Sequence, residues 1–224
     1  MIGEIHRFDT VTSTQEAARL LISEGRAKAG DVVLADSQTA GRGRFGREWR
    51  SPIGGLYATF LLEDGTLLPL SAGVAVALAL ERFGLKPGLK WPNDIVIDKK
   101  KLGGIIVEKV GDIALVGIGI NLSTAPLKGS TCALEHGVMI DRDTLLEAIR
   151  AELEAEREEG EVLASYLSRS VTIGLRISVK RGNLPPLFGI ARGIDEEGRL
   201  LVETGLGIVP ISSGDCFHLL SRGG

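Results

Sequence analysis

Arginine and glycine alternate in one short segment whose chemistry suits anion binding. Residues 41–50 read GRGRFGREWR, with four arginines against one glutamate, whereas the whole chain has a formal net charge of −3. Each guanidinium is a planar, permanently charged set of donors that matches a phosphate or a carboxylate. Glycine lets main-chain N–H groups approach such a ligand closely. We expect this segment, the arginine loop, to hold an anion, although an RNA-binding tail or a solvated turn can have the same composition.

Three later segments also combine residue types that suit a ligand site. KWPND (90–94) places an ammonium beside a rigid Trp-Pro step, followed by an amide and a carboxylate. KLGG (101–104) and GIGIN (117–121) put glycines inside predicted strands, where glycine often marks the close approach of a ligand or another backbone. Each segment taken alone also fits a structural role, as an edge-strand turn, a β-bulge or a tightly packed strand.

The hydrophobic pattern predicts the elements that must position these segments. Strands are expected at 4–8, 31–36, 56–62, 89–91, 94–97, 102–110 and 114–122, and helices after Ser13, over 70–83 and over 143–159, with a second helical stretch ending near 170. Ser13 and Glu16 form a capping-box pattern. Six glutamates between 151 and 161 are expected to face water. The pattern predicts an α/β (α+β) domain with a mixed sheet flanked by helices.

Short β segments replace this pattern after residue 174. They are expected at 176–180, 188–194, 200–203, 208–211 and 217–220, with a hairpin at 195–199. This texture is typical of a small β-barrel. The sequence therefore predicts two domains, residues 1–173 and 174–224.

Composition narrows the function classes. No apolar run approaches the ~20 residues that span a bilayer, and the N-terminus lacks a signal-peptide pattern, so a cytoplasmic protein is expected. Cys132 and Cys216 lack a CxxC spacing, and the three histidines are scattered. This pattern gives no support to a zinc cluster or a catalytic triad. With a pI near 5.7, the chain does not look like a duplex-DNA binder.

Taken in order, the motifs resemble those of the biotin protein ligase (biotin–[acetyl-CoA-carboxylase] ligase) family. They are STQ (13–15), QTAGRGR (38–44), KWPND, KLGG and GIGIN, and the match runs from about Ile5 to the end of the chain. The resemblance implies a catalytic domain like those of class II aminoacyl-tRNA synthetases and an SH3-like C-terminal domain. It also implies that biotin and ATP form biotinyl-5′-AMP with release of pyrophosphate. Biotin then passes to a lysine of the biotin carboxyl carrier protein of acetyl-CoA or propionyl-CoA carboxylase, or of a related biotin enzyme.

The resemblance also implies roles for individual residues. Catalytic roles fall to Lys90, Arg44 and Lys101, of which Lys90 would bridge the biotin carboxylate and the α-phosphate. Biotin would be bound by Ser13, Thr14, Gln15, Gln38, Gly41, Arg42, Gly43, Lys101 and Gly104. ATP would be bound by Arg42, Arg44, Trp49, Lys90, Asn93 and Asn121, with Asp94 as a ligand of Mg²⁺. The chain departs from the usual family pattern at Gln15, where asparagine is common, and at Phe45, where a basic residue is common.

Partners and alternatives complete these expectations. The first motif begins at Ser13, which leaves no room before it for a helix-turn-helix domain, so direct DNA contact is not expected. Monofunctional relatives often pair through their sheets, so a homodimer is expected. A lipoate ligase or octanoyltransferase is the nearest alternative enzyme. A nucleotide- or RNA-binding module is the alternative that is not an enzyme.

Overall fold

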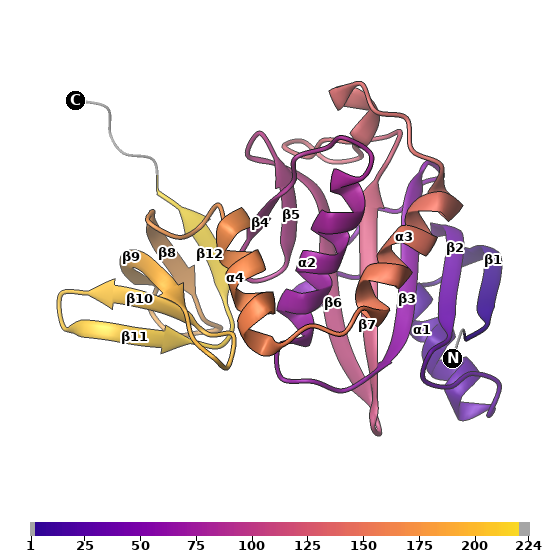
Figure 1. The fold of residues 1–224 in the computed structure, drawn as a ribbon, viewed down its shortest axis with the longest axis horizontal. Coiled ribbons are helices and arrows are strands. Elements are labelled where there is room, and N and C mark those ends of the chain that lie inside the picture. Colours follow the sequence, from indigo (N-terminus) through magenta and orange to yellow (C-terminus); the bar gives the residue numbers. More distant parts are fainter. Residues whose placement is uncertain (1–2, 220–224) are drawn as a thin grey trace.

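Seven strands form the larger of two β-sheets in the computed structural model, which describes residues 3–219. The strands follow the order β1-β2-β3-β7-β6-β5-β4, and only β1 and β2 are parallel neighbours (Figure 1). They are β1 (Ile5–Val11), β2 (Val32–Gln38), β3 (Gly55–Glu63), β4 (Gly88–Lys90), β5 (Asp94–Ile97), β6 (Lys100–Val110) and β7 (Ile113–Asn121). The mixed sheet expected from the sequence is confirmed.

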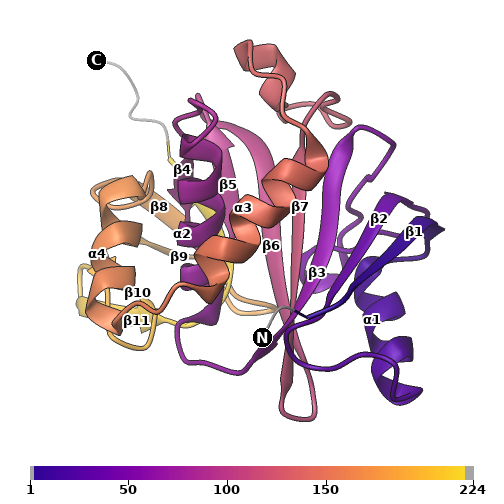
Figure 2. The same ribbon diagram turned by 45° about the vertical axis from the view of Figure 1, so that its right-hand side comes forward.

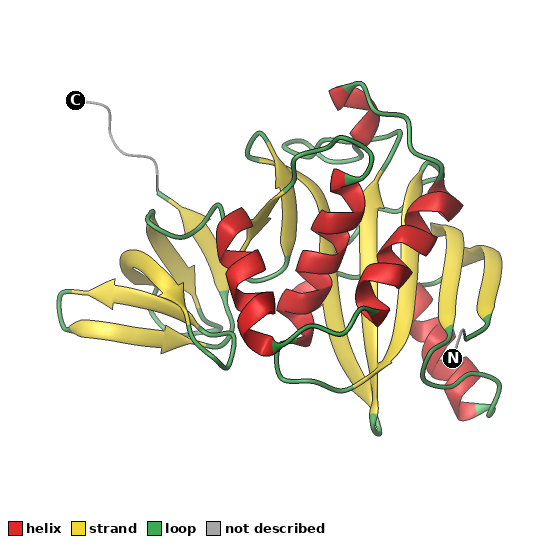
Figure 3. Cartoon of the chain, viewed as in Figure 1, coloured by secondary structure: helices red, strands yellow, loops and turns green. Residues whose placement is uncertain are grey.

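Helices cover both faces of this sheet. Helix α1 (Thr14–Ser23) packs against β2 and β3 on one face, and α2 (Leu68–Glu81) and α3 (Arg142–Glu154) pack on the other (Figures 1 and 2). Because side chains alternate along a strand, β7 serves both layers. Val116 joins the main core under α2 and α3, whereas Leu115 packs under α1. Figure 3 shows α2 and α3 in red in front of the yellow strands of this sheet.

Five antiparallel strands form the smaller sheet at the other end of the chain. They are β8 (Arg176–Lys180), β9 (Leu187–Ile194), β10 (Leu200–Thr204), β11 (Gly207–Ile211) and β12 (Asp215–His218), in the order β11-β10-β9-β8-β12. The predicted hairpin at 195–199 joins β9 to β10. Within residues 3–219, the end strands β11 and β12 are not hydrogen-bonded to each other, so the barrel is not closed. Leu220, which ends the last predicted strand, lies outside the described residues.

The acidic stretch after residue 150 differs from its prediction. The helix predicted over 143–159 ends at Glu154, and α4 (Glu159–Arg169) begins after a break. At this break Glu158 and Glu161 form a capping box, which satisfies backbone groups at the start of α4. Glu152 does not face water as expected: it lies on the inward side of α3, is 8% exposed, and pairs with Arg82 and Arg157. A buried carboxylate needs such partners to remain charged.

A short polar network joins the two sheets. The backbone N–H of Val171 donates to the carbonyl of Leu89 at 3.0 Å, beside β4. The Thr172 hydroxyl accepts from the Trp91 N–H at 3.2 Å and lies 3.2 Å from Nε2 of His218 in β12. Thr172 therefore links the end of β4 to the last strand of the smaller sheet.

This network makes stability depend on the protonation of His218. Burial, together with the positive charge of Lys90, lowers the pKa of His218. The unfolded chain, with a histidine pKa of about 6.5, then binds the proton more readily than the native state, so acid weakens the fold. We expect the free energy of unfolding to fall as the pH drops below about 6.5 and to fall less steeply in His218→Gln. Urea titrations of both proteins between pH 5 and 8 test this, and equal slopes would contradict it.

Candidate active site

A cavity of about 490 Å³ lies between the start of α1, strands β6 and β7, and the arginine loop. Most of the residues predicted for the site line it: Ser13, Thr14, Gln15, Gln38, Arg42, Gly43, Arg44, Trp49, Asn93, Lys101 and Gly104. The predicted residues that are not among its lining are Gly41, Lys90, Asp94 and Asn121. Segments that are up to about a hundred positions apart in the chain therefore line the same cavity.

Two glycines of β7 make the floor of this cavity. In GIGIN, Ile118 and Ile120 point into the main core, so Gly117 and Gly119 face the opposite side, toward α1. A Cβ at Gly117 would lie 2.7 Å from Nε2 of Gln15, and one at Gly119 would lie 2.6 Å from Nε1 of Trp49. The cavity exists because this face of β7 carries no side chain at positions 117 and 119. The sequence analysis noted these strand glycines as a sign of close approach by a ligand, but it did not include Gly117 or Gly119 among the site residues.

One end of the cavity is polar and held by hydrogen bonds. The Thr14 N–H donates to Oε1 of Gln38 at 2.8 Å, and Nε2 of Gln38 donates to the Ser51 hydroxyl at 2.7 Å. The fully buried Thr59 donates its hydroxyl to that of Thr14 at 2.8 Å. The predicted N-cap is confirmed, because Ser13 Oγ accepts from the backbone N–H of α1. The sequence analysis did not identify Ser51 and Thr59 as site residues, because neither belongs to a motif.

Gln15 uses the space that Gly117 leaves. Its Nε2 donates to the carbonyl of Leu115 at 3.1 Å and to that of Ile106 at 3.4 Å, which ties α1 to β7 and β6. Its Oε1 is buried without a hydrogen-bond partner among the described residues. The longer side chain at this position therefore reaches across to the sheet, and an acceptor remains free beside the cavity.

Lys101 supplies positive charge inside the cavity. Its Nζ lies 2.5 Å from Oδ1 of Asp94 and 5.3 Å from the centre of the Trp49 ring. A Cβ at Gly104 would come within 3.3 Å of the same Nζ, so glycine leaves room for the ammonium. Asp94 is the counter-ion of this lysine.

Lys90 is not part of the lining but is close to it, because its register partner in β5 is Asp94, the counter-ion of Lys101. It is the last residue of β4, and its charge acts on Cys216 and His218 of β12. Burial raises the pKa of the Cys216 thiol to about 11, even though the positive charge of Lys90 opposes that rise. Of the two lysines that the resemblance made catalytic, only Lys101 is part of the cavity lining, and Asp94 is a neighbour of both.

The arginine loop covers the cavity and contacts α1, Asn93 and the residue before β12. Arg42 pairs with Glu16 of α1 at 2.6 Å, which takes the Glu16 carboxylate away from the predicted capping box. Arg44 donates to Asn93 Oδ1 at 3.4 Å and to the Gly214 carbonyl at 3.2 Å, and its burial lowers the pKa of its guanidinium. Gly41, though outside the lining, is needed for the turn because a Cβ there would lie 2.4 Å from the Trp49 carbonyl.

Two buried polar atoms near the covered end have no partner among the described residues. They are the indole Nε1 of Trp49, in the cavity lining, and Oδ1 of Asn121, at the end of β7. The Asn121 amide Nδ2 is already used, because it donates to the Thr131 carbonyl at 3.0 Å. A free donor and a free acceptor in buried positions suit a flat heteroaromatic ligand.

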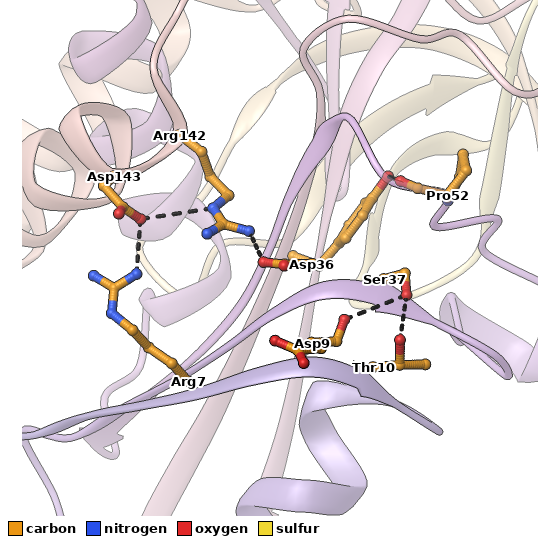
Figure 4. A network of polar contacts seen from close by, with 9 residues as sticks. Arg7, Asp9, Thr10, Asp36, Ser37, Pro52, Arg142 and Asp143 are labelled. Atoms are coloured by element: carbon orange, nitrogen blue, oxygen red, sulfur yellow. Dashed lines mark hydrogen bonds and ion pairs between the residues drawn. The ribbon is translucent and has the colours of Figure 1, made fainter.

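A network on the outer edge of the sheet supports the strand that leads to Gln38. Arg142 at the start of α3 pairs with Asp36 of β2, and Asp143 pairs with Arg7 of β1 at 2.9 Å (Figure 4). The Ser37 hydroxyl lies 2.9 Å from that of Thr10. These contacts hold the end of β2 to its neighbours just before the site residue.

Two negative findings concern metals and membranes. Among residues 3–219 there is no group of three or more His, Cys, Asp or Glu residues placed to hold a metal ion. No helix in this part of the chain has the length and apolar character needed to cross a membrane.

Comparisons with known proteins agree on one family. The model of the biotin/lipoate A/B protein ligase family matches residues 7–124, and that of the biotin protein ligase C terminal domain matches residues 172–219. The chain is 33% identical to the biotin–[acetyl-CoA-carboxylase] ligase of Mycobacterium tuberculosis, over 95% of this chain and 89% of the relative. It is 37% identical to the bifunctional ligase/repressor BirA of Escherichia coli, over 95% and 73%.

Solved structures of the same family have a similar fold. The biotin protein ligase of Aquifex aeolicus, in complex with biotin and ATP, superposes with a TM-score of 0.84 at 31% identity, covering 97% of this chain and 99% of that one. The biotin protein ligase of Leishmania major, in complex with biotinyl-5-AMP, has a TM-score of 0.68 at 30% identity, with 94% and 99% covered.

Proposed function

Because this chain belongs to the biotin/lipoate A/B protein ligase family, we propose that it is an ATP-dependent biotin protein ligase. It activates biotin to biotinyl-5′-AMP with release of pyrophosphate. It then transfers biotin to a lysine of the biotin carboxyl carrier protein of an acetyl-CoA carboxylase. The observation that carries this function is the cavity itself, which is polar at one end, cationic at the other and floored by glycine.

The polar end suits the ureido ring of biotin. A ureido group has one carbonyl acceptor and two N–H donors, and it needs partners for all three when it is buried. Ser13, Thr14 and Gln38 present hydroxyl and amide groups there, and Oε1 of Gln15 is an acceptor without a partner. An aliphatic acid such as lipoate or octanoate offers no donor to the unpartnered Oε1 of Gln15, which favours biotin over those acids.

The cationic end suits the two reacting groups. A biotin carboxylate oxygen attacks the α-phosphorus of ATP, the bond to the β-phosphate oxygen breaks, and pyrophosphate leaves. No base is required because the carboxylate is already ionised at neutral pH. In this proposal Lys101, in the cavity lining, holds the carboxylate and the α-phosphate together, and Arg42 and Arg44 stabilise the charge that develops on the phosphate. The carrier lysine amine then attacks the acyl carbon, and AMP leaves.

We assign the adenine base of ATP to Trp49 and Asn121, and the Mg²⁺ ion that accompanies ATP to Asp94. Trp49 stacks on adenine, and the free Oδ1 of Asn121 accepts from its amino group. Mg²⁺ bound to ATP supplies charge neutralisation at the phosphates. Such an ion commonly takes one or two carboxylates together with substrate phosphates, so Asp94, beside Lys101 and near Arg44, fits as its single protein ligand.

Pyrophosphate release tests the function directly. The protein mixed with biotin and Mg·ATP is expected to release pyrophosphate, to accumulate biotinyl-5′-AMP and to label a biotin carboxyl carrier domain. The same assay with lipoate and a lipoyl domain is the control, and preferential labelling of that domain would favour a lipoate ligase. Salt-dependent RNA binding without ATP turnover would instead favour a binding module.

The buried hydroxyl of Thr59 is expected to control biotin affinity through Thr14. Thr59→Val removes the hydrogen bond that orients Thr14, so we expect the dissociation constant of biotin to rise about fivefold, as the loss of a ~1 kcal/mol hydrogen bond would produce. Isothermal titration calorimetry measures this change. Thr204→Val, which removes an exposed hydroxyl in the smaller sheet, is the control. An unchanged biotin affinity in Thr59→Val would contradict the proposal.

Several wider features belong to the same proposal. The division into a catalytic domain (1–173) and an SH3-like domain (174–224) follows the two sheets. A cytoplasmic location fits a carboxylase subunit as acceptor, and a net charge of −3 argues against a DNA partner. A homodimer follows from the family resemblance, and sedimentation at several protein concentrations tests it.

A further inference from the structure

Two arginines of the arginine loop contact neighbouring residues, Gly214 and Asp215, at the edge of the smaller sheet. Arg44 Nη1 donates to the Gly214 carbonyl at 3.2 Å, and Arg47 Nη2 lies 2.8 Å from Oδ1 of Asp215. These partners are adjacent residues at the start of β12, about 170 positions from the loop. The side chains of Arg44 and Arg47 therefore both contact the two-residue segment 214–215 at the smaller sheet.

The conformation of the arginine loop depends on its contacts with the smaller sheet. Phe45, between the two anchored arginines, has φ = 56°, which is strained for a residue other than glycine, and its side chain is 62% exposed. No apolar burial of Phe45 offsets the strain. The backbone bonds that close the loop join Gly43 to Arg47 and Trp49 to Gly41, both within the loop. Such a conformation persists only where surrounding contacts hold it.

The anchor itself is rigid. Asp215 pairs with Lys180 in the ladder between β12 and β8. Gly214 has φ = 152°, and a Cβ there would lie 2.7 Å from Val179 Cγ1 and 2.9 Å from the Lys180 carbonyl. The Gly214 carbonyl is therefore fixed by the sheet, and the Asp215 carboxylate, 25% exposed, is more shielded than its partner arginine.

We propose that Asp215, together with the Gly214 carbonyl, positions the arginine loop over the cavity, so that the smaller sheet controls the phosphate-binding arginines. Asp215 is a positioning residue, since it acts through Arg47 and does not line the cavity. The kinetic consequence rests on the proposed function, whereas the attachment of the loop does not. An isolated exposed ion pair contributes little, but here it acts together with the Arg44 contact on a strained loop.

Asp215→Asn removes the charge while keeping the shape of the side chain. We expect faster hydrogen–deuterium exchange in peptides covering residues 41–50, above all at the amides of Gly43 and Trp49. We also expect KM for ATP to rise about fivefold, with a change of less than about twofold in KM for biotin, because the anchored loop carries Arg42 and Arg44, which serve the phosphates. Glu203→Gln, which breaks the Arg192 ion pair in the same sheet, is the matched control.

A charge exchange separates positioning from a structural effect. Arg47→Asp combined with Asp215→Arg should restore slow exchange and lower KM for ATP relative to either single change. If Asp215→Asn does not fold, Arg47→Gln removes the same contact from the loop side. Exchange and KM in Asp215→Asn equal to those of Glu203→Gln would overturn the proposal, as would a loss of stability without faster exchange in the loop. A wild-type protein that releases no pyrophosphate would refute the function, while the exchange measurement would still test the anchor.

Discussion

Lys101→Ala is expected to lower the rate of biotin adenylation by about 10²–10³-fold, the loss typical of removing one preorganised charge-stabilising group from an enclosed site. The Lys101 ammonium is the cation placed between Asp94 and the Trp49 ring in the cavity. Its removal leaves the developing charge on the carboxylate and phosphate without its nearest partner. Single-turnover formation of biotinyl-5′-AMP measures the loss, and circular dichroism checks that the fold is retained.

Substitutions of two other lysines test whether the loss of rate is specific to Lys101. Lys100→Ala changes an exposed neighbour at the start of β6 and should leave the rate within about twofold of the wild-type rate, as surface substitutions usually do. Lys90→Ala tests the role that the sequence resemblance assigned to Lys90. Because Lys90 is not part of the cavity lining, we expect a smaller loss of adenylation than in Lys101→Ala. An equal or larger loss in Lys90→Ala would return the main catalytic role to that residue.

Gly117→Val is expected to raise the dissociation constant of biotin by at least about 100-fold, equivalent to ~2.7 kcal/mol. Even a Cβ at this position would lie 2.7 Å from Gln15 Nε2 and 2.8 Å from Ile106 Cγ2, and the two methyl groups of valine would fill space above the floor. The change also displaces Gln15, so we expect a stability loss of about 1–3 kcal/mol from overpacking. Calorimetric titration with biotin and urea unfolding separate the two effects.

A strand glycine outside the cavity provides the matched control. In Gly193→Val, the new Cβ meets no atom within 4 Å, and Gly193 lies in β9 of the smaller sheet. This variant should bind biotin with wild-type affinity. If Gly117→Val also bound biotin normally, the ring of biotin could not lie on the floor formed by β7, and the assignment of the cavity would be wrong.

Much of the fold could be predicted because its elements have strong local signals. Short apolar runs predicted β3 and β7 to within a residue or two, and Ser13 marked the start of α1. The boundary between α3 and α4 was missed because a glutamate-rich stretch continues the helical pattern through the break. Local patterns do not show which member of a charge run faces inward, so the burial of Glu152 was missed as well.

The sequence by itself determined the family, the fold class and the chemistry available, because motif order, strand periodicity and residue type are local properties of the chain. Only the tertiary structure decided which groups meet. It put Lys101, but not Lys90, in the lining of the cavity, since the direction of a side chain at a strand end depends on register and twist. It also brought Asp215 to Arg47 across 168 positions, a contact that no local pattern encodes.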